Sequence, residues 1–148
     1  MPKRVMQCAA FVAMVTAGAG AWASEDAIET RQNIMENVGA AMQVAGNTAR
    51  GEIAFDPVAV ELALRTMNSS IIGFVHYFPE GSHEGDTRAE PEIWEEMENF
   101  LERATVMREA TATAIAAEPQ DVDSLRAVFG DIADSCGDCH EPYRVPED

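Results

Sequence analysis

The hydrophobic residues of this chain recur at helical spacing in four stretches, which are separated by breaker residues. The first stretch runs from about Glu25 to Asn47, and Ser24 is its expected N-cap. Its apolar residues repeat every seven positions, with a second set three positions later: Ile28, Met35 and Met42, then Val38 and Ala45. This spacing predicts a helix with one apolar stripe, as in a helix bundle.

The second predicted helix begins at Asp56-Pro57, where an N-cap residue precedes a proline at the first helical position. It is expected to continue to about Phe78. Residues 78–91 then combine two prolines, two glycines and several acidic residues, a composition that is typical of a loop.

The third predicted helix runs from near Glu90-Pro91 to about Ala117. Its expected core-facing residues share two heptad positions: Trp94, Leu101, Arg108 and Ile115 on one, and Met97, Ala104 and Thr111 on the other, with Phe100 beside them.

A fourth helix is expected after Asp121, which can cap it. Its predicted stripe contains Leu125, Phe129, Ile132, Cys136 and Cys139/His140. No segment shows sustained alternation of period two, so the sequence predicts an all-α protein. Short connections favour an antiparallel up-down-up-down four-helix bundle.

The first 23 residues have the pattern of a secretory signal peptide. Lys3 and Arg4 precede an uncharged apolar run, and Ala21-Trp22-Ala23 is a small-x-small cleavage site. We therefore predict a cleaved leader, residues 1–23, and a single mature domain, residues 24–148, with no further membrane span and an extracytoplasmic, periplasmic location.

The predicted mature chain is strongly acidic. Without Lys3 and Arg4 it contains eight arginines, no lysine and 26 acidic residues, a formal charge of −18. Such a chain repels phosphates, which excludes nucleic acid as a partner. The charge is equally consistent with attraction of a basic protein partner and with solubility alone.

Near the C-terminus the chain reads CGDCHEPYR, from Cys136 to Arg144. Cys136 and Cys139 are the only cysteines outside the predicted leader, which contains Cys8. A redox dithiol is disfavoured, because such a motif needs a βαβ context and a helix N-terminus. A zinc site is disfavoured as well, because structural zinc sites draw four ligands from two separated pairs.

Cys-x-x-Cys-His is also the attachment motif of c-type haem. On a helix, Cys136, Cys139 and His140 are at i, i+3 and i+4 and share a face. Two thioether bonds could then hold one covalent haem c near the C-terminal helix, with His140 as the proximal iron ligand. The motif, the predicted export of the chain and the number of cysteines all favour this interpretation.

A haem motif on the last of four helices resembles the class II cytochromes c, the cytochrome c′ family. The resemblance covers the whole mature chain. It is carried by four segments: RQNIMENVG (31–39), FPEGS (78–82), AEPEIWEEMENF (89–100) and CGDCHEPYR (136–144). The loop and Trp94 look most like the low-spin branch, whose iron has methionine and histidine ligands.

The resemblance implies that Met35 is the distal iron ligand and that Arg31 contacts a haem propionate. From the residues alone, core packing is the favoured role for Met35, although methionine is a known axial ligand of haem. Arg31 has no acid at helical i±3 or i±4, so it needs an anion or a route to water. His76 is a less favoured sixth ligand, and His83 is expected to be solvated.

The expected function is electron transfer by a periplasmic monohaem cytochrome that contains no catalytic residues. Redox partner proteins with a basic docking surface are the expected partners. The alternative is a five-coordinate binder of diatomic gases such as NO or CO. The sequence leaves open a monomer or a homodimer. Pro142 should end or bend the last helix, which leaves the roles of Tyr143 and Arg144 open.

Overall fold

The structure is a computed structural model that describes residues 19–146, with side chains described from Glu25 onward. Its helices are α1 (Ala19–Arg50), α2 (Pro57–Phe74), α3 (Glu92–Glu95), α4 (Met97–Ala116) and α5 (Val122–Tyr143). The described residues contain no strand beyond an isolated bridge between Ala89 and Arg144. The predicted leader lies largely outside the described residues.

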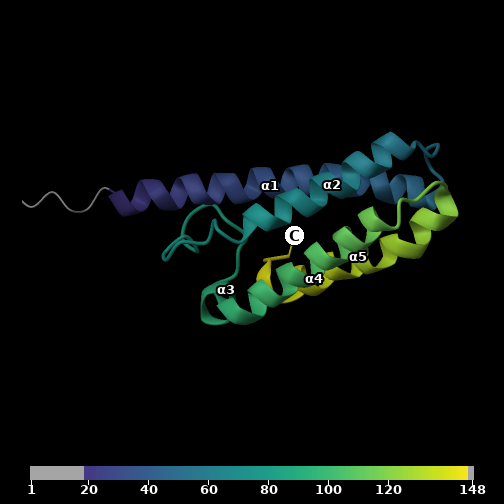
Figure 1. Cartoon of the computed structure of the whole chain (residues 1–148). Helices are drawn as coiled ribbons and strands as arrows, with labels where there is room; N and C mark the ends of the chain where they lie inside the picture. The colour runs from purple at the N-terminus through teal and green to yellow at the C-terminus, as the bar shows by residue number, and fades with distance from the viewer. Residues whose placement is uncertain (1–18, 147–148) are drawn as a thin grey trace, which may run out of the picture.

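The four long helices form an antiparallel bundle, as predicted. α1 and α2 lie side by side in one layer, and α4 and α5 form the other (Figure 1). α2 also packs against α4, and α1 against α5, so each long helix has two neighbours. None of the helices in the described part of the chain has the length and hydropathy that crossing a bilayer requires.

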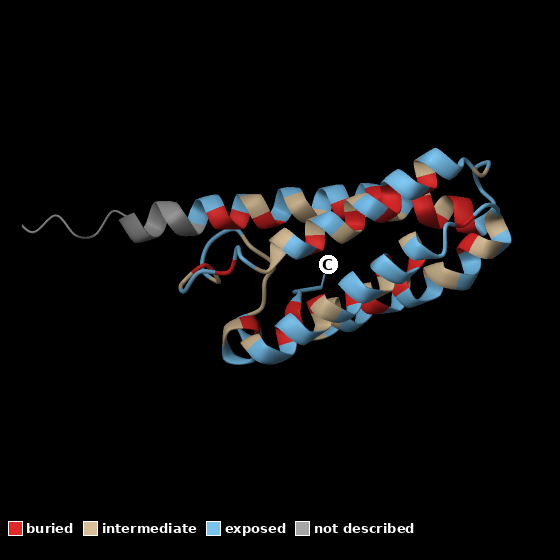
Figure 2. Ribbon diagram, viewed as in Figure 1, coloured by how far each residue is buried: buried red, intermediate tan, exposed pale blue. Residues whose placement is uncertain are grey.

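The buried residues lie on the inward faces of the helices (Figure 2). They form two clusters. The larger cluster runs along the bundle and includes Val38, Leu64, Met67, Leu125 and Ile132. The smaller, mainly aromatic cluster lies where α3, α4 and the end of α5 meet, and consists of Phe78, Ile93, Phe100 and Tyr143.

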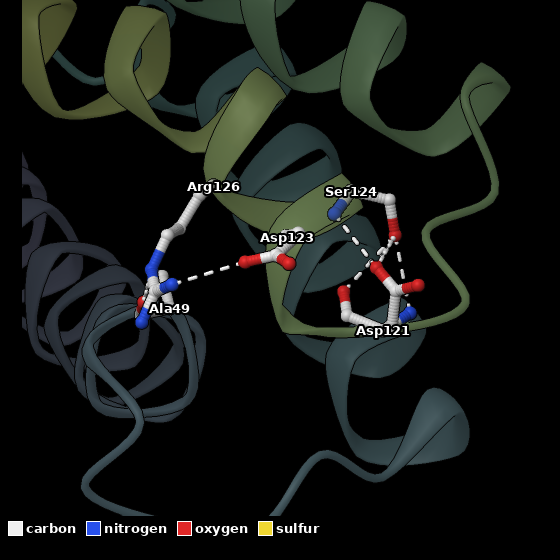
Figure 3. A network of polar contacts seen from close by, with 5 residues as sticks. All are labelled: Ala49, Asp121, Asp123, Ser124 and Arg126. Carbon is white, nitrogen blue, oxygen red and sulfur yellow. Dashed lines mark hydrogen bonds and ion pairs between the residues drawn. The ribbon is translucent and has the colours of Figure 1, made fainter.

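Local capping signals fix where α2 and α5 begin, as the sequence predicted. The Asp56 side chain accepts hydrogen bonds from the Val58 and Ala59 amides at 2.9 and 3.2 Å. Asp121 and Ser124 form a reciprocal capping box at the start of α5 (Figure 3). Nearby, Arg126 donates to the Ala49 carbonyl at the end of α1, which ties the two helices together.

Two predicted boundaries are wrong. Ser24 is not an N-cap, because α1 already begins at Ala19, in an alanine-rich segment of high helix propensity. α2 ends at Phe74 rather than Phe78. Phe78 precedes Pro79, which disfavours helical conformation, and its ring packs inward in the aromatic cluster.

The predicted third helix is broken in two. Glu96 has φ −121° and ψ 41°, which separates α3 from α4. Of the two predicted heptad positions, the one with Ala104 and Thr111 is buried as expected, and so is Phe100, but the one with Leu101 and Arg108 is not. Leu101 is 40% exposed and Arg108 is exposed, whereas the buried stripe is Phe100, Ala104, Met107, Thr111 and Ala114. Ile93 and Phe100, on either side of the break, both belong to the aromatic cluster.

The cap of α2 provides a test of this fold. We expect Asp56→Ala to lower the free energy of unfolding by about 1 kcal/mol, because two backbone N–H groups lose their acceptor. Denaturant titration of the holoprotein measures the change. Asp134→Ala, at an exposed position within α5, is the control and should change it by less than about 0.5 kcal/mol. Equal effects of the two substitutions would contradict the cap.

Candidate haem-binding site

A cavity of about 480 Å³ lies between the two layers of the bundle, at the end where the aromatic cluster is found. Members of both clusters line it, among them Val38, Ile71, Phe100 and Met107. Its size is within the range of pockets that hold a small molecule or cofactor, and apolar side chains predominate in its lining.

The predicted attachment motif opens on this cavity. Cys136, Cys139 and His140 belong to the last turns of α5, and all three line the cavity from that one helix. Each is partly buried, and both thiols are free. Met35 lines the same cavity from α1, in the other layer of the bundle. The structure thus brings together the four residues that were expected to hold a haem.

The environment of the motif sets its protonation. Burial raises the pKa of the Cys136 thiol, and it raises the pKa of Cys139 to about 11, although the nearby Arg103 charge opposes the second shift. Both cysteines are therefore neutral thiols at neutral pH, unlike the thiolate of a redox dithiol.

Burial also lowers the pKa of His140, and the positive charges of Arg144 and Arg88 lower it further. The neutral imidazole is the form that has a free nitrogen lone pair for a metal.

A zinc site finds no support in the part of the chain that the structure describes. Within residues 19–146, no three His, Cys, Asp or Glu side chains come together as a metal-binding group. Neither His76 nor His83 lines the cavity, so neither is placed to act as a sixth ligand. His83 instead stacks edge-on against Trp94, with 5.3 Å between the ring centroids.

Arg31 has partners that the sequence did not reveal. Its side chain is 4% exposed and donates to the Tyr77 carbonyl (3.1 Å), to the Ser82 hydroxyl and carbonyl (2.8 and 2.7 Å), and to the Thr87 hydroxyl (3.3 Å). The guanidinium also lies 4.7 Å from the centroid of the Phe78 ring. Oxygens of the loop thus satisfy Arg31 without an anion. Since Arg31 also lines the cavity, its contact with a propionate stays a prediction.

The segment after His140 is held by the loop before α3. The Glu90 amide donates to the Tyr143 carbonyl at 3.1 Å, and the Val145 amide donates to the Arg88 carbonyl at 2.9 Å. The Arg88 side chain donates back to the Val145 carbonyl. As expected from Pro142, α5 ends shortly afterwards, at Tyr143.

Three residues where this segment meets the loop before α3 have roles that sequence reasoning left open or missed. Tyr143 is buried, and its hydroxyl donates to Glu96 at 3.3 Å. Arg88 and Arg144 line the cavity beside Arg31. No local sequence pattern indicated that these arginines line a cavity, because the cavity wall that they share is assembled from segments more than 40 residues apart in the chain.

The side chains that line the cavity are by themselves of the kinds that hold a haem. An apolar wall suits the macrocycle, two thiols and a neutral imidazole share one helical face, and three arginines suit its carboxylates. Fold and site together define a four-helix-bundle protein of the c-type haem class.

The chain belongs to the cytochrome c′ family, whose family model, described as "Cytochrome C'", matches residues 26–144. Proteins of this family carry covalently bound haem c. The chain is 30% identical over 127 residues to a cytochrome c-556 of Agrobacterium fabrum (strain C58), covering 86% of each chain.

Solved structures show the same fold. The cytochrome c′ from Rhodopseudomonas palustris superposes with a TM-score of 0.79 at 28% identity, covering 83% of this chain and 98% of the other. The NMR-validated structural model of oxidised R. palustris cytochrome c556 gives 0.75 at 29% identity, covering 84% and 99%.

The Arg31 contacts can be tested by substitution. We expect Arg31→Met to lower the free energy of unfolding by about 2 kcal/mol and to speed amide exchange in residues 77–87, because the loop oxygens lose a charged donor. Denaturant titration and hydrogen exchange measure these effects. Arg108→Met makes the same change at an exposed arginine and should do neither. Unchanged exchange in Arg31→Met would show that Arg31 does not hold the loop.

Proposed function

We propose that this protein is a periplasmic monohaem electron carrier. Cys136 and Cys139 attach the haem, His140 is its proximal iron ligand, and Met35 is the distal ligand. The observation that carries the proposal is the shared cavity: one face of α5 presents two thiols and an imidazole to an apolar space that the Met35 side chain also lines. Haem iron supplies a one-electron couple, so the chain needs no catalytic residue of its own.

The residues around the cavity suit electron transfer. Apolar side chains predominate in the lining, and ligation by both Met35 and His140 would keep the iron geometry nearly constant between oxidation states. Methionine and histidine ligation favours a high reduction potential relative to two histidines. Relatives named cytochrome c-556 support this assignment by similarity over most of the chain.

A second candidate is a five-coordinate protein that binds diatomic gases. It is supported by the similarity to a cytochrome c′, whose structure superposes at least as well as that of the cytochrome c556. A second observation also supports the gas binder. The side chain of Met35 is only partly buried, and Met107 lines the same cavity, so Met35 is not the only methionine there. The two candidates differ in whether a methionine sulfur occupies the distal position.

The visible spectrum distinguishes the two. For the electron carrier we expect sharp α and β bands in the reduced protein and no reaction with CO. Met35→Ala should convert the iron from low to high spin and allow CO to bind, because the sixth ligand is lost.

Met107→Leu is the matched control, since Met107 lines the same cavity from α4, and it should leave the spectrum unchanged. A wild-type protein with a broad high-spin spectrum and ready CO binding would favour the gas binder. A spectrum that changes in Met107→Leu but not in Met35→Ala would assign the ligand to Met107.

The charge of the mature chain points to a basic redox partner, whether the protein is a monomer or a homodimer. With a formal charge of −18 after residue 23, the protein should attract a cationic redox protein over long range.

Salt should therefore slow the encounter. We expect the second-order rate of electron transfer with a small cationic redox protein to fall roughly tenfold between about 10 and about 200 mM salt, because ions screen the attraction. Stopped-flow kinetics measure this rate, and reduction by a neutral small molecule is the control. A rate with the cationic protein that does not change with salt would show that the acidic surface does not steer partners.

A further inference from the structure

The last turn of α5 contains a proline. Pro142 lies within the helix, one residue before its end at Tyr143 and two residues after His140. In an α-helix the N–H of residue 142 would donate to the carbonyl of residue 138. Proline has no N–H, and its ring crowds that same carbonyl. Asp138, which directly precedes Cys139, therefore lacks the donor that the helix would normally supply.

Arg103 supplies a donor from the neighbouring helix. Its Nη1 lies 2.8 Å from the Asp138 carbonyl oxygen, a good length for a charge-assisted hydrogen bond. Arg103 is in α4, 35 residues earlier in the chain, and α4 packs along α5. The bond therefore crosses the helix interface at the position where the backbone bonding of α5 is interrupted.

The position of Arg103 is itself fixed. Its guanidinium lies 6.0 Å from the centroid of the Tyr143 ring, and the Tyr143 hydroxyl donates to Glu96 at the break between α3 and α4. The ring of Tyr143 also packs edge-on against Phe100, with centroids 5.5 Å apart. Arg103 thus contacts both Asp138, which directly precedes Cys139, and Tyr143, which directly follows Pro142.

We infer that Arg103 is a positioning residue for the haem-attachment segment: it replaces the N–H that Pro142 lacks and so holds the last turn of α5, with Cys139 and His140, against α4. The position of His140 then depends on a side chain whose hydrogen bond goes to the backbone of Asp138 and not to the cysteines or the histidine. The link from this turn to the iron rests on the proposed function, whereas the link from Arg103 to Pro142 does not.

A double-mutant cycle in the haem-loaded protein tests the inference. Arg103→Met removes the donor but keeps the length of the side chain, and Pro142→Ala restores a backbone N–H that can reach the Asp138 carbonyl. We expect Arg103→Met to raise the unfolding equilibrium constant roughly tenfold. In the Pro142→Ala background the same substitution should raise it less than about threefold, because the carbonyl then has a second donor. Arg108→Met, on the exposed face of the same helix, should leave it nearly unchanged.

The NMR shifts of the haem methyl protons in the oxidised protein report the orientation of the proximal ligand. They should move in Arg103→Met and return towards their original values in the double variant. Equal losses of stability in both backgrounds would overturn the inference, as would haem shifts that the Pro142→Ala change does not restore.

A further measurement covers the case in which Pro142→Ala folds poorly. The Arg144 amide donates to the His140 carbonyl at 3.1 Å and so reports on the last turn. Its hydrogen exchange should be roughly tenfold faster in Arg103→Met than in Arg108→Met, since an open last turn exposes it. Equal exchange in the two variants would overturn the inference.

Failure of the proposed function would look different from failure of this inference. If Cys136 and Cys139 do not attach the haem, the haem will separate from the denatured wild-type chain. The coupling between Arg103 and Pro142 concerns protein atoms only. The double-mutant cycle in unfolding stability would therefore still support or overturn the inference.

Discussion

The helical spacing of Cys136, Cys139 and His140 is the constraint on which the rest of this structure depends. A cofactor held at three points of one chain needs three side chains on one face, and positions i, i+3 and i+4 of an α-helix meet that need. The helix must then persist to His140, at the end of the domain, where helices tend to fray. The surroundings of α5 counter fraying: a backbone bridge between Ala89 and Arg144, the buried Tyr143, and the bond from Arg103 to the Asp138 carbonyl.

The opposite wall of the cavity depends on a second constraint, the burial of Arg31. A charged group taken out of water is costly unless its donors are satisfied. The loop between α2 and α3 meets this cost with carbonyl and hydroxyl oxygens and with the faces of Phe78 and Trp94. The same contacts fix the loop over the end of the cavity. One buried arginine therefore determines the path of a segment that has no regular secondary structure of its own.

The parts of the fold that the sequence predicted well are those with local causes. Asp56 and Asp121 cap their helices through amides two or three residues away, and the haem motif is five residues long. The parts it missed depend on distant partners. The oxygens that bind Arg31 lie 46 to 56 residues further along the chain, and no local pattern indicates them. In α4 the sequence correctly placed Phe100, Ala104 and Thr111 on the core side but wrongly added Leu101, because Leu101 also fits a heptad and only the packing against α2 and α5 distinguishes the two.

The distribution of charge links the site to its proposed role. Of the eight arginines after the predicted leader, Arg31, Arg88 and Arg144 line the cavity, and Arg103 binds the turn that contains Cys139. Half of the mature positive charge is thus concentrated at one end of a very acidic protein. With a haem bound in the cavity as proposed, these guanidinium groups would stabilise its reduced state, whereas the surrounding carboxylates would stabilise its oxidised state. Since a charge in a low-dielectric interior acts more strongly than a screened surface charge, the buried Arg31 can offset several exposed acids. On the proposed function, the acidic surface would attract a cationic partner over long range while the arginines at the cavity separately tune the potential of the haem.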